Sequence, residues 1–122
     1  MEEYRKDDEL ARCMVEWGWR YHHVGIPTRQ VRPGETYLPH LKFSVSASSP
    51  FGAEWMRFDE ECGMHELIQT VPHIAFVVED LDFELATRGF TILTKPNPPS
   101  EGVRVAMIEH NGVPIELIEF SS

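Results

Sequence analysis

Two segments of the chain begin and end with similar sequences, and this repetition constrains the fold more than any other feature. "HVGIPT" begins at His23 and "HIAFVV" begins at His73, so each apolar run follows a histidine. Further along, "AEWMRF" and "IELIEF" each carry a glutamate, Glu54 or Glu116, four residues before a phenylalanine. Self-similarity of this kind indicates two related structural units in one chain.

The length of the chain limits how these units are arranged. With 122 residues, of which 42% are hydrophobic and 11% aromatic, the chain is long enough for one hydrophobic core. We therefore expect a single domain over residues 1–122. Its first module is expected at about 19–58, a connector at 59–71 and a second module at 72–120.

The second module has the clearer pattern. We expect a strand at 73–79, a helix capped by Asp80 and ending at Gly89, a strand at 90–96, and a rigid loop at 97–102. Two apolar runs then surround Asn111-Gly112, a dipeptide suited to the type I′ turn of a hairpin. The order is strand, helix, strand, strand, strand.

The first module offers strands in corresponding places but no helix. Strands are expected at 20–26, 41–47 and 53–58, with a loop rich in proline across 27–39. A short amphipathic helix should precede them, capped by Asp7 or Asp8 and ending near Gly18, and one or two helical turns are expected around 64–69. The fold class predicted is α+β: paired βαβββ-type modules forming a curved mixed sheet, the first module lacking its helix, plus an N-terminal helix.

Charge and composition exclude several classes of function. The formal net charge is −9, and the basic residues form no cluster beyond two adjacent ones, which argues against binding nucleic acid or an anionic membrane. No apolar run reaches 18 residues, and the first ten residues lack the apolar core of a signal peptide. Cys13 and Cys62 have no CxxC spacing, so we expect reduced thiols in a cytoplasmic protein.

Strand alternation assigns faces to the candidate functional residues. His73 shares a face with Ala75, and Phe76 belongs to the opposite face, which the helix should cover. Alternation likewise sends His22 to the face opposite His23, and the overlay of the two modules selects His23. Two imidazoles and two carboxylates, from His23, His73, Glu54 and Glu116, would suit a divalent Zn, Ni, Co, Mn or Fe ion.

The segments "HHVGIP", "PHIAFVVEDLD" and "VRVAMIEHNGVPIELIEF" resemble the vicinal oxygen chelate superfamily, which includes glyoxalases, methylmalonyl-CoA epimerases, extradiol dioxygenases and antibiotic-resistance proteins. The glyoxalase and epimerase pattern is the nearest, over roughly 20–26 and 53–120. The resemblance implies metal ligands at His23, Glu54, His73 and Glu116, with Glu54 or Glu116 moving a proton. It also implies an isomerase, epimerase or lyase that forms an enediolate or enolate from a small oxygenated substrate, and a homodimer.

One departure from the family pattern affects the substrate. His23 and Glu54 are 31 residues apart (54 − 23), whereas His73 and Glu116 are 43 apart (116 − 73). The loop at 27–39 thus replaces the helix that shapes the pocket in the relatives, so a glutathione thiohemiacetal or a CoA thioester does not carry over to this chain.

Several roles stay open at this point. Tyr37 and His40 flank the loop and are candidates to line a pocket. Arg57 and Arg104 are candidates to bind a substrate carboxylate or to form ion pairs. Two alternative functions also remain: an iron-dependent dioxygenase that uses two histidines and one carboxylate without Glu54, and a metal-free protein that binds a small ligand.

Overall fold

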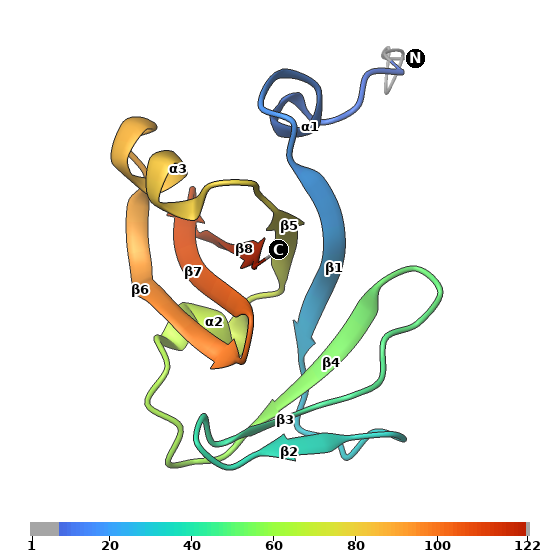
Figure 1. Cartoon of the computed structure of the whole chain (residues 1–122). Helices are drawn as coiled ribbons and strands as arrows, with labels where there is room; N and C mark the ends of the chain where they lie inside the picture. Colours follow the sequence, from blue (N-terminus) through green and yellow to red (C-terminus); the bar gives the residue numbers. More distant parts are fainter. Residues whose placement is uncertain (1–7, 122) are drawn as a thin grey trace.

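A single curved mixed sheet of eight strands forms the body of the computed structural model, which describes residues 8–121 (Figure 1). The strand order across the sheet is β2-β3-β4-β1-β5-β8-β7-β6. In chain order the elements are α1 (Arg12–Glu16), β1 (Arg20–Pro27), β2 (Thr36–Leu38), β3 (Phe43–Val45), β4 (Ala53–Phe58), α2 (Glu66–Thr70), β5 (His73–Val77), α3 (Leu81–Thr87), β6 (Thr91–Ser100), β7 (Val103–His110) and β8 (Val113–Phe120). The predicted α+β class and curved mixed sheet are confirmed.

The two strands that begin the repeated segments lie side by side at the centre of the sheet. β1 and β5 pair antiparallel, with Gly25 opposite His73. Each also pairs in parallel with the strand that carries its glutamate: Gly25 lies opposite Glu54 on β4, and Ala75 lies opposite Glu116 on β8. The four strands with the candidate residues are therefore consecutive in the sheet.

The hydrophobic core lies on the face of the second half that α3 covers. Its buried members are Trp19, Phe76, Val78, Leu81, Ala106, Ile108 and Leu117. Asp80 caps α3 by accepting a hydrogen bond from Phe83 N, which fixes the start of the helix as predicted. Phe76 and His73 alternate along β5, so packing Phe76 under α3 leaves His73 on the opposite face of the sheet.

The hairpin of β7 and β8 has the expected turn. Asn111 and Gly112 have φ angles of 50° and 82°, and His110 pairs with Val113 across the turn. Positive φ at both central residues defines the type I′ turn. This turn fixes the register that places Glu116 opposite Met107.

A loop covers the outer face of β4, where the second half of the molecule has a helix. The Arg32 guanidinium lies 3.8 Å from the centre of the Trp55 ring. Glu35 accepts two hydrogen bonds from Arg57, at 2.8 and 3.0 Å. Between β1 and β4 the chain forms only the short strands β2 and β3, so the predicted absence of a helix there is confirmed.

Three predicted boundaries are wrong. α1 begins at Arg12, its N-cap is Ala11 without a side-chain hydrogen bond, and Asp8 therefore does not cap it; Asp7 lies outside the described residues. Part of the expected loop, Thr36–Leu38, forms β2. The expected loop at 97–102 instead continues β6 to Ser100, because β6 is an edge strand whose pairing with β7 is irregular on both sides of Asn97, and proline is tolerated on the outer side of an edge strand and at such irregularities.

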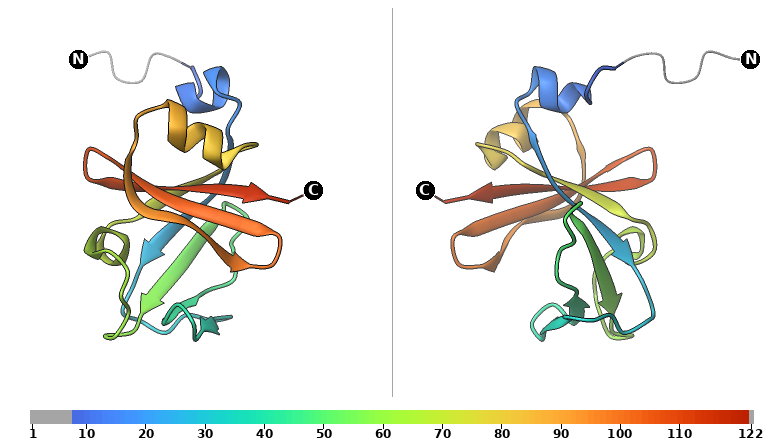
Figure 2. Two further views of the ribbon diagram at one scale, coloured as in Figure 1. Left: turned by 60° about the vertical axis from the view of Figure 1, so that its left-hand side comes forward. Right: turned by 90° about the vertical axis from the view of Figure 1, so that its right-hand side faces the viewer.

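The sheet curves away from α1 and α3, which lie at one end of the molecule in both views of Figure 2. None of the helices within residues 8–121 is long and apolar enough to cross a membrane. Cys13 and Cys62 are free thiols.

Candidate metal centre

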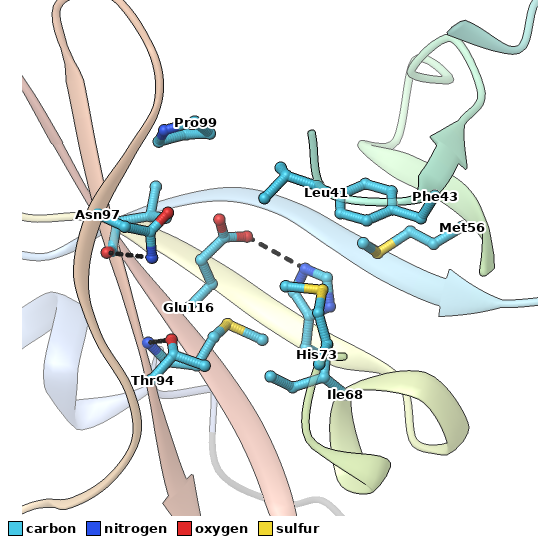
Figure 3. Close-up of a pocket in the computed structure, with 12 residues that line it drawn as sticks. Leu41, Phe43, Met56, Ile68, His73, Thr94, Asn97, Pro99 and Glu116 are labelled. Carbon is cyan, nitrogen blue, oxygen red and sulfur yellow. Dashed lines mark hydrogen bonds and ion pairs between the residues drawn. The ribbon is translucent and has the colours of Figure 1, made fainter. Parts of the chain in front are cut away.

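Three of the four residues singled out in the sequence meet at one point. His73 Nε2 lies 3.1 Å from Glu116 Oε1, and His23 Nε2 lies 3.3 Å from the same oxygen. The two Nε2 atoms are 3.3 Å apart. Central β1, central β5 and neighbouring β8 supply one side chain each, so the antiparallel and parallel pairings of these strands create the cluster. Figure 3 shows two of the three side chains, His73 and Glu116, which a dashed line joins.

The three atoms have the separations that a single metal ion requires. Nitrogen and oxygen ligands lie about 2.0–2.2 Å from ions such as zinc, which places neighbouring ligand atoms roughly 2.8–3.6 Å apart across octahedral and tetrahedral angles. The observed separations of 3.1 to 3.3 Å fall in this range. The donor set of two imidazoles and a carboxylate also suits a borderline divalent ion, so His23, His73 and Glu116 fit a metal.

Electrostatics keep Glu116 in its ionised form. Burial would raise the pKa of this carboxyl, but hydrogen bonds and attraction from His23 and His73 outweigh burial and lower the pKa from 4.5 to about 2. Burial likewise works against the charged form of His23, yet Glu116, with a smaller contribution from Glu54, raises the pKa of this imidazole above 6.5. A carboxylate that stays ionised is ready to bind a cation.

Gly25 sets the position of the His73 ring. A Cβ atom at Gly25 would lie 2.1 Å from His73 Cε1 and 2.6 Å from His73 Nε2. Only a residue without a side chain leaves room for the imidazole at this point of β1. Sequence reasoning missed Gly25, although an isolated glycine inside a strand signals a close approach of another group.

Glu54 lies beside the cluster and not within it. Its Oε2 is 3.9 Å from His23 Nδ1, which is the ring nitrogen that faces away from Glu116. The three-residue set within ligand distance therefore excludes Glu54. About 20% of its side chain is exposed, so Glu54 reaches both His23 and solvent.

The prediction that His22 and His23 point to opposite faces is wrong. The register of β1 against β5 shifts between Tyr21 and His23, and this irregularity breaks the strict alternation. The Nδ1 atoms of His22 and His23 consequently lie 2.7 Å apart. His23 still supplies its Nε2 atom to the cluster. His22 lies on the Nδ1 side of the His23 ring, next to Phe120.

A largely apolar cavity adjoins His73 and Glu116. The other residues that line it come from both halves of the sheet, from α2 and from two loops: Leu41, Phe43, Met56, Met64, Ile68, Thr94, Asn97, Pro99, Val105 and Met107. In Figure 3 Leu41, Phe43 and Met56 lie on one side of Glu116, and Thr94, Asn97 and Pro99 lie on the other. Sequence reasoning missed the contribution of β6, because residues 97–102 were expected to be a loop.

The remaining candidates do not line the cavity. Tyr37 donates a hydrogen bond of 2.6 Å to Asp59, and neither Tyr37 nor His40 lines the cavity. Arg57 is paired with Glu35, and Arg104 with carboxylates that lie away from the cavity, so both form ion pairs.

No family model matches the sequence, and no curated protein sequence matches it either. Solved structures do match. The hypothetical protein BH1468 from Bacillus halodurans C-125 has a TM-score of 0.65 and 19% identity, over 85% of this chain and 96% of that chain. Methylmalonyl-CoA epimerase from Mycobacterium tuberculosis has a TM-score of 0.57 and 19% identity, over 84% and 89%.

The chain shares its fold with methylmalonyl-CoA epimerases. The methylmalonyl-CoA epimerase of Streptomyces coelicolor, in complex with 2-nitronate-propionyl-CoA, matches over 84% of this chain and 98% of that chain, with a TM-score of 0.57 and 16% identity. At such identities the likeness concerns the fold, which is the one that the sequence resemblance implied.

Proposed function

We propose that this protein is a metal-dependent isomerase, epimerase or lyase that acts on a small oxygenated substrate by way of an enediolate or enolate. The triangle of His23 Nε2, His73 Nε2 and Glu116 Oε1 carries the proposal, because its edges of 3.1 to 3.3 Å match a shared ion. The likeness of the fold to methylmalonyl-CoA epimerases supports the reaction class.

His23, His73 and Glu116 would hold the metal, a divalent Zn, Ni, Co, Mn or Fe ion. It would supply Lewis acidity that stabilises negative charge on the substrate oxygens when a neighbouring carbon loses its proton. The protein keeps the site in place before the substrate arrives: Gly25 leaves room for the His73 ring, and the contacts of Glu116 with both histidines keep it ionised.

Glu54 is the better placed of the two glutamates to move the proton. A general base needs a free carboxylate oxygen that can reach the substrate, whereas Glu116 Oε1 is already shared between two imidazoles. Glu54 lies outside this triangle and is partly exposed. In this assignment Glu54 accepts the proton from carbon and returns it to carbon or oxygen, and Glu116 remains an anionic ligand.

One observation favours a second candidate function. The three-residue set of His23, His73 and Glu116 is complete without Glu54, and two histidines with one carboxylate form the facial triad of iron-dependent oxygenases. An iron-dependent dioxygenase is therefore the alternative, and the identity of the metal separates it from the isomerase or lyase.

Metal analysis of protein purified without chelator tests the proposal first. The expected result is one divalent ion per chain, with affinity lost in a His73→Ala variant. Exchange of a substrate C–H for deuterium in heavy water, followed by NMR, then tests enolate chemistry. Ferrous iron with oxygen consumption would select the dioxygenase, and a protein that binds none of the five metals would overturn both functions.

We also propose a cytoplasmic location and a homodimer. The free thiols of Cys13 and Cys62 support a reducing compartment such as the cytoplasm. A homodimer is expected from the family resemblance, with a small molecule as the ligand. The acidic net charge of −9 supports a protein that binds neither nucleic acid nor an anionic membrane.

A further inference from the structure

We infer that the substrate of this site carries an uncharged, apolar substituent beside its chelating oxygens, and is not an anionic cofactor ester such as a CoA thioester. The inference rests on the proposed function, since it names the substrate class of the same site. It follows from the side chains that surround Glu116 and His73 and from the positions of the lysine and arginine side chains.

The cavity next to the metal ligands offers an apolar surface from several elements at once. Phe43 and Met56 come from β3 and β4, Ile68 comes from α2, and Met107 comes from β7. Leu41 completes this wall at the end of the loop before β3. Methionine side chains adapt to the shape of an apolar group, so a wall with three of them, Met64 being the third, suits aliphatic or aromatic substituents.

The polar groups of the lining are largely engaged within the sheet. Thr94 Oγ1 accepts a hydrogen bond of 3.0 Å from Met107 N. The amide nitrogen of Asn97 donates to Lys95 O at 3.2 Å and to Val105 O at 3.5 Å. Both side chains therefore hold irregular β6 against β7, and the amide of Asn97 directs its donor away from a ligand anion.

No lysine or arginine lines this cavity in the part of the chain that the structure describes. Two arginines are adjacent in sequence to lining residues, Arg57 to Met56 and Arg104 to Val105. Carboxylates neutralise both of them: Glu35 pairs with Arg57, and Asp82 and Glu119 pair with Arg104. A carboxylate or phosphate that entered the cavity would lose hydration without gaining a cation from the protein. An alkyl or aryl group would instead gain by leaving water.

A second cavity that does contain arginines gives an anion no net attraction. Arg29 and Arg57 line it, but so do Asp59 and Glu60, and Arg57 also bonds to Glu35. The charges at this cavity cancel, and the whole chain carries a net charge of −9. The phosphates of CoA therefore find no complementary surface at either cavity.

A matched set of hydroxamic acids tests the inference, because a hydroxamate offers two neighbouring oxygens to a metal. The set comprises acetohydroxamic acid, hexanohydroxamic acid, and the six-carbon analogue whose terminal methyl is replaced by a carboxylate. With zinc-loaded protein and calorimetry, the hexano compound is expected to bind about tenfold or more tighter than the aceto compound, since each buried CH₂ contributes roughly three- to fourfold. The carboxylate analogue should lose this gain.

Amide shifts of Thr94 and Met107 in metal-free protein provide a readout that does not need the metal. There the hexano compound should shift both amides and the carboxylate analogue should not. If metal binding fails but this ranking holds, the proposed function falls and the apolar class stands. Equal or tighter binding of the carboxylate analogue, or tighter binding of a CoA thioester than of the hexano compound, would overturn the inference while leaving the metal enzyme intact.

A variant of the wall with a matched control completes the test. Leu41→Gln places a polar group in the cavity without touching a metal ligand, and should reduce the preference for the hexano over the aceto compound to less than about threefold. Leu10→Gln makes the same change at a side chain that is 64% exposed and absent from the cavity, and should leave the preference unchanged. An unchanged preference in Leu41→Gln would contradict the apolar wall.

Discussion

Gly25 and His73 lie opposite each other on neighbouring strands, with no space between them for a methyl group. A Cβ at Gly25 would lie 2.1 Å from His73 Cε1, so Gly25→Ala must displace the ring or the strand. We expect metal affinity to fall at least about tenfold and the free energy of unfolding to fall by about 1–3 kcal/mol. Calorimetric metal titration and urea denaturation measure the two effects.

Gly63→Ala is the matched control, because nothing lies within 4 Å of a Cβ there and its φ is not positive. It should change neither quantity. A Gly25→Ala protein with wild-type metal affinity would show that the His73 ring does not need its present position.

Glu116→Gln keeps the shape of the side chain and removes its charge. Since Glu116 Oε1 contacts Nε2 of both histidines, we expect the affinity for zinc to fall by about 100-fold or more. Glu109→Gln, on neighbouring β7 and away from the cluster, should leave the affinity unchanged. Equal affinities in the two variants would remove Glu116 from the ligand set.

Glu54→Gln separates proton transfer from metal binding. Because Glu54 lies outside the ligand triangle, we expect the metal content to stay at wild-type level while the rate of substrate deuterium exchange falls by about 10²–10⁴-fold. NMR follows the exchange, and elemental analysis gives the metal content. If the metal is lost as well, Glu54 is a fourth ligand and its side chain moves toward the ion when the site fills.

His22 should orient His23 through the 2.7 Å contact between their Nδ1 atoms. When His23 Nε2 binds a cation, its proton must lie on Nδ1, where His22 can accept it. We expect His22→Ala to weaken zinc binding by about 10- to 100-fold, and His22→Asn, whose amide oxygen lies near the position of Nδ1, to restore most of it. A purely structural role would give equal losses in both variants.

We expect the whole ligand set to come from one chain, and a mixing experiment tests this expectation. His23→Ala protein mixed with His73→Ala protein should recover no metal binding, because each chain lacks one corner of its own triangle. Calorimetric titration of the mixture against the separate variants measures the recovery. Substantial recovery would mean that two subunits exchange strands and share the ligands.

Much of the site could be predicted because strand alternation has a fixed period. Packing Phe76 under α3 determines that His73 faces the other way, and the type I′ turn at Asn111 determines the register of Glu116. The repeated motifs then place His23 on the neighbouring strand. These inferences need only local pattern and elementary pairing rules.

The parts that escaped prediction depend on irregular backbone. The register shift beside His22 turns the side chains of His22 and His23 toward each other. No residue type in this segment predicts such a shift. The prolines near Asn97 predicted a loop, because proline is unfavourable inside a sheet. An edge strand such as β6 can contain proline, but which strand lies at the edge depends on the whole sheet and not on the local sequence. The cavity was missed with these prolines.

The loop that covers β4 in place of a helix makes the two halves of the molecule unequal. All buried members of the main core except Trp19 come from residues 76–117, so the first half has fewer buried contacts to hold it. His23 belongs to that half, whereas His73 and Glu116 belong to the other. An ion bound by all three would therefore link the two halves across the pairing of β1 with β5. Its binding would stabilise the first half, which has fewer buried contacts of its own.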